Sequence, residues 1–219
     1  MSLNERQFIA KDDALKSLEE FGLPDSRNDS LDITSWHARV ARIVLEEKVP
    51  IDVRQTFENA KNISLYSYYS YRLHQSAEII GYKALEQALK AKYDAVKGAL
   101  SQNPPKTLAN YVEIALEQSW VTDEKMFSMR PIAAERVRER HVRKMILNGE
   151  IEAEPVASPK PTEEQILQEL RSMQVARKAL HGARRMRNYH MHEDTGLSDT
   201  SAEVLQDLAE LINQIFSGN

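Results

Sequence analysis

Apolar residues recur every three or four positions along almost the whole chain of 219 residues. This spacing matches the turn of an amphipathic α-helix and not the alternation of a half-buried strand. Ala, Leu, Glu, Gln, Lys and Arg dominate, and these residues favour helices. The β-branched runs bounded by turn dipeptides that are typical of strands are absent. We therefore expect an all-α protein folded as an up-and-down helical bundle.

The composition excludes several classes of protein. The chain has no Cys, which removes disulfide frameworks, thiolate nucleophiles and Cys-ligated zinc. Its first ten residues are polar, and no apolar run approaches the roughly 20 residues of a membrane span. No nucleophile elbow, Gly-rich phosphate loop or metal-hydrolase motif is present. We expect a cytoplasmic protein that lies outside the membrane and uses no metal or cofactor.

Turn residues and capping signals divide the chain into expected helices. An Ala-rich helix over residues 65–97 has small residues at helical spacing, so another helix can approach it closely, and we expect it to be central. Capping boxes begin at Thr162 and at Thr200. A proline-containing linker covers residues 149–161. The other expected helices cover residues 3–21, 34–48, 52–64, 107–120, 123–148, 162–190 and 201–216.

Two features of the Ala-rich helix admit more than one interpretation. His74 lies inside it and is expected to be a core or interface histidine. Four tyrosines between positions 66 and 71 begin it. Stacking on nucleic-acid bases is one role for such a cluster, and packing in the core or at an interface is the favoured one.

Positive charge is concentrated in two segments, although the whole chain has a net charge of −4. Residues 130–144 have a net charge of +4, and residues 171–192 contain six Arg or Lys and no acid. Such segments offer local sites for anions, above all phosphate. The simpler alternative is that they are solvated helix faces.

The nine residues from 184 to 192 contain the strongest candidates for functional residues. They contain Arg184, Arg185, Arg187 and Asn188, followed by His190 and His192. Arg holds phosphate with a fixed fork of donors, and His moves protons near neutral pH. A metal-independent ribonuclease needs both, because a base deprotonates the ribose 2′-OH while cations stabilise the charge that develops at phosphorus.

Helix geometry limits how these groups meet. Arg187 and His192 are five residues apart, so an unbroken helix separates them by about 140°. Asn188 and His192 share a face, as do Arg184 and Asn188. Either fraying of the helix at His190 or a second subunit is needed to bring Arg187 and His192 to one phosphate.

The segment Arg187-Asn188-Tyr189-His190-Met191-His192 resembles the signature of HEPN domains, in which Arg is followed by a polar residue, three further residues and His. The pair Arg185 and His190 fits a looser form of the signature. Residues 71–90, which include Lys83-Ala84-Leu85-Glu86, are similar to the second helix of that family. The order of a long helix, a short helix, a motif-bearing helix and a closing helix also matches.

The resemblance implies a small helical bundle over residues 52–219, with an insertion at about 121–160 and an N-terminal helical extension at 1–48. Many members of the family are dimeric, metal-independent endoribonucleases of toxin–antitoxin and defence systems. By this resemblance Arg187 holds the scissile phosphate, His192 is the general base or acid, and Asn188 orients the site. The neighbouring Arg184, Arg185 and His190 are expected to contact phosphate or RNA. Expected partners are RNA, a second copy of the chain, and a separate antitoxin or regulatory protein.

Three alternatives stay open. Other HEPN-like proteins are non-catalytic modules that bind a protein or nucleotide partner. The arginines of the motif segment pair with acidic residues of the same chain in the simplest alternative, which needs no RNA. His190 and His192 are possible metal ligands only if the backbone between them is not helical.

Overall fold

The computed structural model describes residues 16–17, 19, 22–28, 32–100, 104–148, 160–192 and 199–217, with side chains up to residue 190 in the segment that ends at 192. These residues form eight α-helices and no strand, so the expected all-α fold is confirmed for them. The α-helices are α1 (Ile33–Ala41), α2 (Ile51–Tyr66), α3 (Leu73–Val96), α4 (Leu108–Glu117), α5 (Arg130–Leu147), α6 (Glu163–Met173), α7 (Val175–His192) and α8 (Ser201–Phe216). Short 3-10 turns are η3 (Ser26–Asn28), η4 (Lys97–Ala99), η5 (Asp123–Lys125) and η6 (Phe127–Met129).

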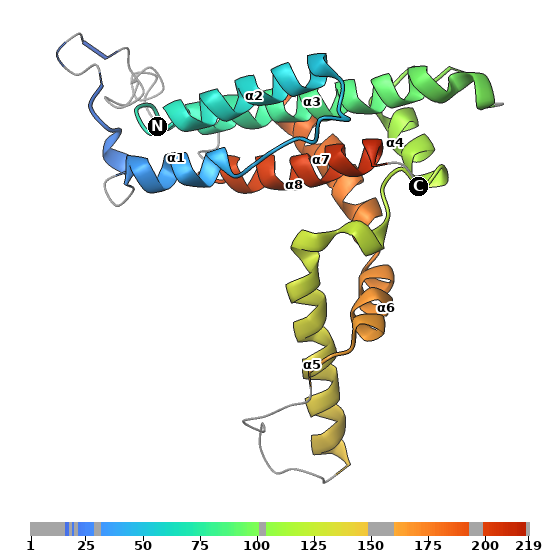
Figure 1. Ribbon diagram of the computed structural model, residues 1–219. Helices are drawn as coiled ribbons and strands as arrows, with labels where there is room; N and C mark the ends of the chain where they lie inside the picture. The colour runs from blue at the N-terminus through green and yellow to red at the C-terminus, as the bar shows by residue number, and fades with distance from the viewer. Residues whose placement is uncertain are drawn as a thin grey trace, which may run out of the picture.

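The bundle is built around α3, which packs against α2, α8, α7 and α4 (Figure 1). Its small residues Ala77, Ala84 and Ala88 are fully buried, as the expected central helix requires. Gly81 lies against α8, where an added Cβ would come within 2.7 Å of Leu205 and 2.9 Å of Leu208. Small side chains on α3 therefore allow α8 to approach closely.

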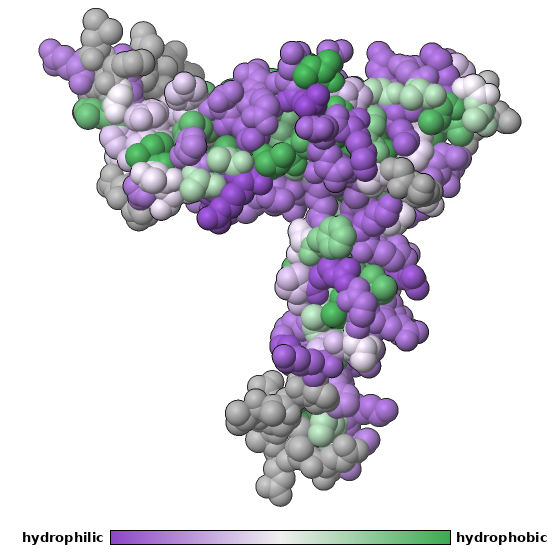
Figure 2. Space-filling view, in the orientation of Figure 1, coloured by the Kyte–Doolittle hydropathy of each residue, from purple (hydrophilic) through white to green (hydrophobic). Residues whose placement is uncertain are grey.

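The arm, which consists of α5 and α6, projects from the middle of the bundle (Figure 1). The two helices pack on each other, and their residues Ala133, Val142 and Leu170 are buried. α5 belongs to the segment expected as an insertion, as do η5 and η6 before it, and the arm continues through α6 to Met173. Hydrophobic residues (green in Figure 2) are visible on the arm among hydrophilic ones (purple).

Two expected helices are each interrupted. The helix expected over 65–97 begins only at Leu73, because residues 67–72 form a turn that contains most of the tyrosine cluster. The helix expected over 162–190 divides at Gln174, whose φ of 51° and ψ of 51° place it in the left-handed region. This division separates the arm from α7. Of the other expected helices, α5 begins later than residue 123, after η5 and η6.

One of the two expected capping boxes is confirmed. Thr162 accepts a hydrogen bond from the Gln165 N–H, and the Gln165 side chain accepts one from the Thr162 N–H. The box expected at Thr200 is wrong, since the Thr200 side chain makes no capping bond and its hydroxyl donates to Glu78 instead. At the start of α1, the Asp32 carboxylate caps the helix by accepting a hydrogen bond from the Ser35 N–H.

Residues near the N-terminus complete the same core. Trp36 and Val40 of α1, and Val49 after it, are buried together with residues of α2 and α8. The Trp36 indole N–H donates to the carbonyl of Ser64. The described part of the expected N-terminal extension therefore packs with the bundle, whereas the helix expected over 3–21 lies mainly outside the described residues. No described helix is long and apolar enough to span a membrane.

Candidate functional site on α7

α7 carries the motif residues, and its start is fixed by a contact with η5. The Ala176 N–H donates to Asp123 Oδ1 at 2.8 Å, which satisfies a donor at the helix N-terminus. Ala176, Leu180 and Ala183 are buried and define the inner face of α7, which packs on α3 and α4. The helix continues to His192, so it does not fray at His190, which is one of the two ways of bringing Arg187 and His192 together.

Arg187 extends the inner face of α7 and meets a carboxylate of α3. Its Nη2 lies 3.1 Å from Glu86 Oε2, and both side chains are about one-third exposed, at 34% and 38%. Its Nη1 donates to Asn188 Oδ1 at 3.3 Å. The guanidinium is therefore neutralised within the chain but stays within reach of solvent.

His190 lies deeper on the same face. Its Nε2 is 3.0 Å from Glu78 Oε2, and the two side chains are only 4% and 2% exposed. The other oxygen of Glu78 accepts a hydrogen bond from the Thr200 hydroxyl, and the Tyr82 ring stacks on the imidazole at 5.9 Å. Burial, followed by the Glu78 charge, raises the pKa of the Tyr82 phenol far above its usual range. This arrangement holds the imidazole against α3 and away from solvent.

The outer face of α7 presents a different set of groups. Arg185 and Asn188 are exposed, as is Tyr189 at 43%. Arg184 is half-buried between the two faces, and its Nε has no hydrogen-bond partner among the described residues. Neither Arg184 nor Arg185 has a carboxylate partner in the part of the chain that the structure describes. Arg185, which is exposed, is therefore available to an external anion.

The motif residues are thus divided between two faces. Arg187 and His190 face α3, whereas Arg185 and Asn188 face outward. The side chain of His192 lies outside the described residues, but its backbone belongs to α7. Because the helix is unbroken, positions 187 and 192 lie about 140° apart around its axis. A single chain does not bring these two positions to one phosphate.

Sequence reasoning missed Glu78 and Glu86, the two carboxylates that meet the motif. A signal exists, because Glu78, Tyr82 and Glu86 follow one another at four-residue intervals and so share one face of α3. This spacing does not reveal that the helix facing the two carboxylates is α7. The alternative that the motif arginines pair with acids of the same chain is correct for Arg187. Outside the motif, Arg177 Nη1 lies 3.9 Å from Glu113 of α4.

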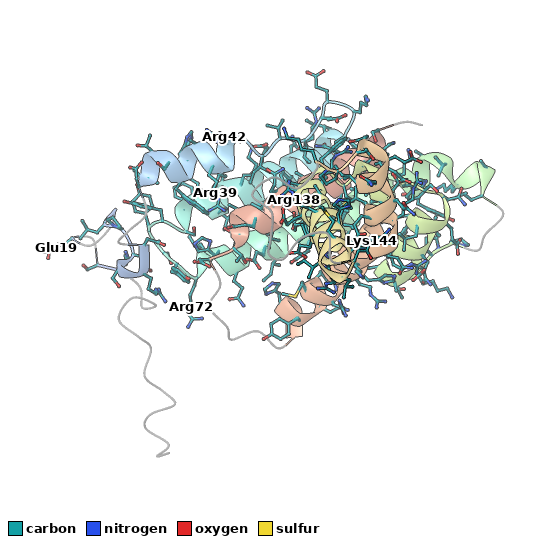
Figure 3. All side chains as sticks on the ribbon, turned by 90° about the horizontal axis from the view of Figure 1, so that it is seen from below. Glu19, Arg39, Arg42, Arg72, Arg138 and Lys144 are labelled. Atoms are coloured by element: carbon teal, nitrogen blue, oxygen red, sulfur yellow. The ribbon has the colours of Figure 1, made fainter. Side chains whose placement is uncertain are left out.

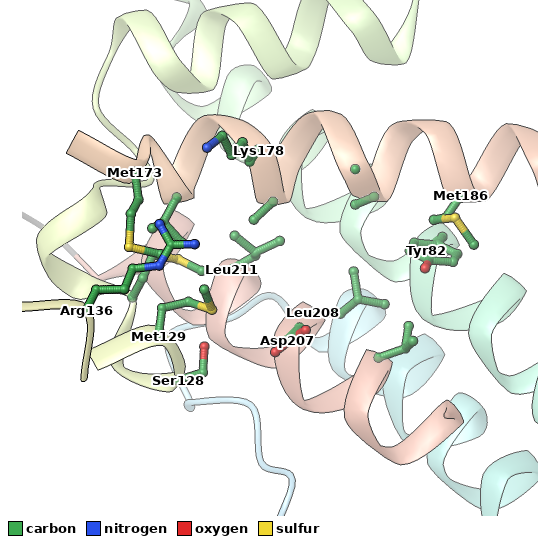
Figure 4. A pocket seen from close by; sticks show the side chains of 16 residues that line it. Tyr82, Ser128, Met129, Arg136, Met173, Lys178, Met186, Asp207, Leu208 and Leu211 are labelled. Carbon is green, nitrogen blue, oxygen red and sulfur yellow. The ribbon is translucent and has the colours of Figure 1, made fainter. Parts of the chain in front are cut away.

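A pocket of about 470 Å³ lies beside this site, where the arm joins the bundle (Figure 4). Its walls are largely apolar and include four methionines, at positions 126, 129, 173 and 186. Lys178 of α7 and Arg136 of α5 lie toward one end of the pocket, and Tyr82 and Met186 lie at the other. Asp207 of α8 lines one side, where partial dehydration by the walls raises the pKa of its carboxyl group. The volume suits a small ligand or a few apolar side chains of a partner.

His74 belongs to a separate buried network, as expected of a core histidine. Its Nδ1 lies 2.7 Å from Ser201 Oγ, which lies 2.7 Å from Ser64 Oγ. All three residues are at most 2% exposed, so the pair of Ser and His is closed to a substrate. The network ties α2, α3 and α8 together. Burial lowers the pKa of the His74 imidazole.

Within the described residues no group of three His, Asp or Glu side chains is arranged to hold a metal ion. Comparisons of the chain with models of known protein families, with curated proteins and with solved structures found no match. The function is therefore inferred from the residues and contacts of this chain alone.

Proposed function

We propose that the chain is an HEPN-like RNA-binding protein, and that two copies together form a metal-independent endoribonuclease site from the ends of their α7 helices. The observation that supports this most is the outer face of α7, where Arg185 and Asn188 are exposed and Arg185 has no carboxylate partner among the described residues. α7 contains five Arg or Lys and no acidic residue, so its exposed face attracts a polyanion. Arg binds phosphate through paired N–H donors.

In the proposed reaction His192 removes the proton from a ribose 2′-OH. The 2′-oxygen attacks the adjacent phosphorus and the bond to the 5′-oxygen breaks. That oxygen takes a proton from the protonated His192 or from water and leaves as a hydroxyl. Arg187 stabilises the charge on the non-bridging oxygens during the attack. The products are a 2′,3′-cyclic phosphate and a free 5′-hydroxyl, and no metal takes part in these steps.

Two features of α7 set conditions on this reaction. Arg187 has to leave Glu86 to hold a phosphate. Because both side chains are partly exposed, replacing the carboxylate by a phosphate costs little free energy. Because positions 187 and 192 are about 140° apart on one helix, the Arg of one chain has to act with the His of another. The proposal therefore requires a homodimer.

The test is an RNA cleavage assay in the presence of EDTA. The wild-type chain should cleave single-stranded RNA, and His192→Ala and Arg187→Ala should each abolish cleavage. His37→Ala, at an exposed histidine of α1, is the matched control and should retain full activity. If His192→Ala is as active as the wild type, or if varied RNAs stay intact with both, the catalytic proposal is wrong.

A second candidate function is a non-catalytic module that binds a regulatory protein. It is favoured by the inward pairing of Arg187 and His190 and by the methionine-lined pocket. Methionine side chains adapt to varied apolar partners. Phe127 and Ile132, which are 64% and 46% exposed, come from the turn and helix that contribute to the pocket wall. A wild-type chain that neither binds nor cleaves RNA, and whose Met186→Asp variant loses a protein partner, would support this candidate.

A further inference from the structure

The exposed side of α5 carries a row of cations. Arg136, Arg140, Arg143 and Lys144 are all exposed, and their spacing places them within an arc of about 100° on the helix. The acidic residues of α5, Glu135 and Glu139, lie outside this arc. The row extends about 12 Å along the arm, given the rise of a helix.

Most of this charge is unpaired in the part of the chain that the structure describes. Arg136, Arg143 and Lys144 have no carboxylate partner there. Arg140 contacts Glu169 of α6, which is buried, while the Arg140 side chain itself remains 68% exposed. By contrast, Arg138 pairs with Glu135 on another side of α5. Figure 3, which views the molecule along the arm, labels Arg138 and Lys144 on separate sides of the helix.

The row on α5 continues onto α7. Arg136 and Lys178 line the same pocket and lie toward the same end of it (Figure 4). Lys178 and Arg185 are seven residues apart, which places them two turns apart on one face of α7. Both are exposed. The six cations form what we call the cationic track, which runs from the end of α7 to the arm and consists of Arg185, Lys178, Arg136, Arg140, Arg143 and Lys144.

We infer that the cationic track binds the phosphate backbone of single-stranded RNA and holds it against the arm. This inference rests on the proposed function, because it extends the RNA site beyond the end of α7. An extended row of guanidinium and ammonium groups suits a polyanion of regular charge spacing, whose bound counterions are released on contact. The track predicts that affinity increases with RNA length until the strand reaches the arm.

The test is fluorescence anisotropy with labelled RNAs of about 4 and about 16 nucleotides. The double variant Arg143→Glu/Lys144→Glu should weaken binding of the longer RNA about tenfold and leave the shorter one unchanged, because only the longer strand reaches the arm. It should also reduce the slope of log K against log salt by about 1.4, the value for two phosphates of a single strand. Arg143→Gln/Lys144→Gln should have a smaller effect in the same direction.

Arg138→Glu, on the same helix but outside the track, is the matched control and should change the affinity for the longer RNA less than twofold. Equal affinity of the wild type and the double variant for the longer RNA would overturn the inference. In that case, weaker RNA binding by Arg185→Glu would show that the proposed function still stands. A wild-type chain that binds neither RNA would contradict the proposed function itself. The wild type and the double variant are also tested with poly-glutamate. If the double variant loses affinity for poly-glutamate as much as for the longer RNA, the assignment to RNA is overturned in favour of an acidic protein.

Discussion

Glu78 of α3 and His190 of α7 face each other in the interior, with Oε2 and Nε2 3.0 Å apart and both side chains almost fully buried. A carboxylate buried this deeply is tolerated only when its partners remain in place. The pair fixes the end of α7 on α3, two turns of α3 away from the partly exposed pair of Glu86 and Arg187. The two pairs therefore differ in what they contribute to stability.

Glu78→Ala should lower the free energy of unfolding by about 3–5 kcal/mol, because it leaves His190 and the Thr200 hydroxyl without their carboxylate. Glu86→Ala, on the same helix, should cost less than about 1 kcal/mol, because solvent screens its ion pair. Chemical denaturation of both variants measures the difference. Equal losses in the two variants would show that the Glu78 pair has no special role.

Acid should destabilise the protein through His74. Burial lowers the pKa of this imidazole below its usual 6.5, and the nearby carboxylates Asp199 and Glu203 only partly oppose the shift. As the pH falls through 6.5, the unfolded chain gains a proton that the folded chain does not, so the free energy of unfolding falls. The free energy of unfolding stops falling only below the pKa that His74 has in the folded protein.

His74→Gln removes the titrating group and should reduce the stability lost between about pH 8 and about pH 5. Unfolding by urea at both values, for the wild type and the variant, measures that loss. His37→Gln, at an exposed histidine, is the control and should behave like the wild type. An identical pH dependence of the wild type and His74→Gln would contradict the assignment.

The close contact of α3 and α8 at Gly81 predicts opposite effects for two glycine substitutions. Gly81→Ala should destabilise the protein by about 1 kcal/mol or more, because its Cβ would overlap the packed side chains of Leu205 and Leu208. Gly182→Ala meets no atom within 4 Å and should stabilise α7 by up to about 1 kcal/mol. Thermal denaturation distinguishes them, and stabilisation by both would mean that the helices are further apart than described.

Helical periodicity and local capping signals predicted most of the secondary structure, because they depend on neighbouring residues. The interruption at 67–72 contains no Gly or Pro and was not predicted. Distant contacts hold it, since Asn28 donates to the Ser67 and Tyr68 carbonyls and Asp25 accepts from the Tyr71 N–H. The break at Gln174 likewise depends on a remote group, the Asp123 carboxylate that receives the Ala176 N–H.

The candidate site was predicted in part for the same reason. The sequence alone identifies the cations of α7 and their separation around the helix. It does not reveal that Arg187 and His190 meet Glu86 and Glu78, because those contacts depend on how α7 crosses α3. The location of Lys178 and Arg136 at one pocket also follows only from the joint between arm and bundle.

Photocrosslinking tests most directly the central claim that RNA binds the outer face of α7. The wild-type chain is irradiated with single-stranded RNA, and the crosslinked residues are mapped by mass spectrometry. Tyr189, exposed beside Asn188, should be the main site, and Arg185→Glu should greatly reduce its crosslinking. Crosslinks confined to the tyrosines around Tyr66, or an unchanged yield in Arg185→Glu, would contradict the account.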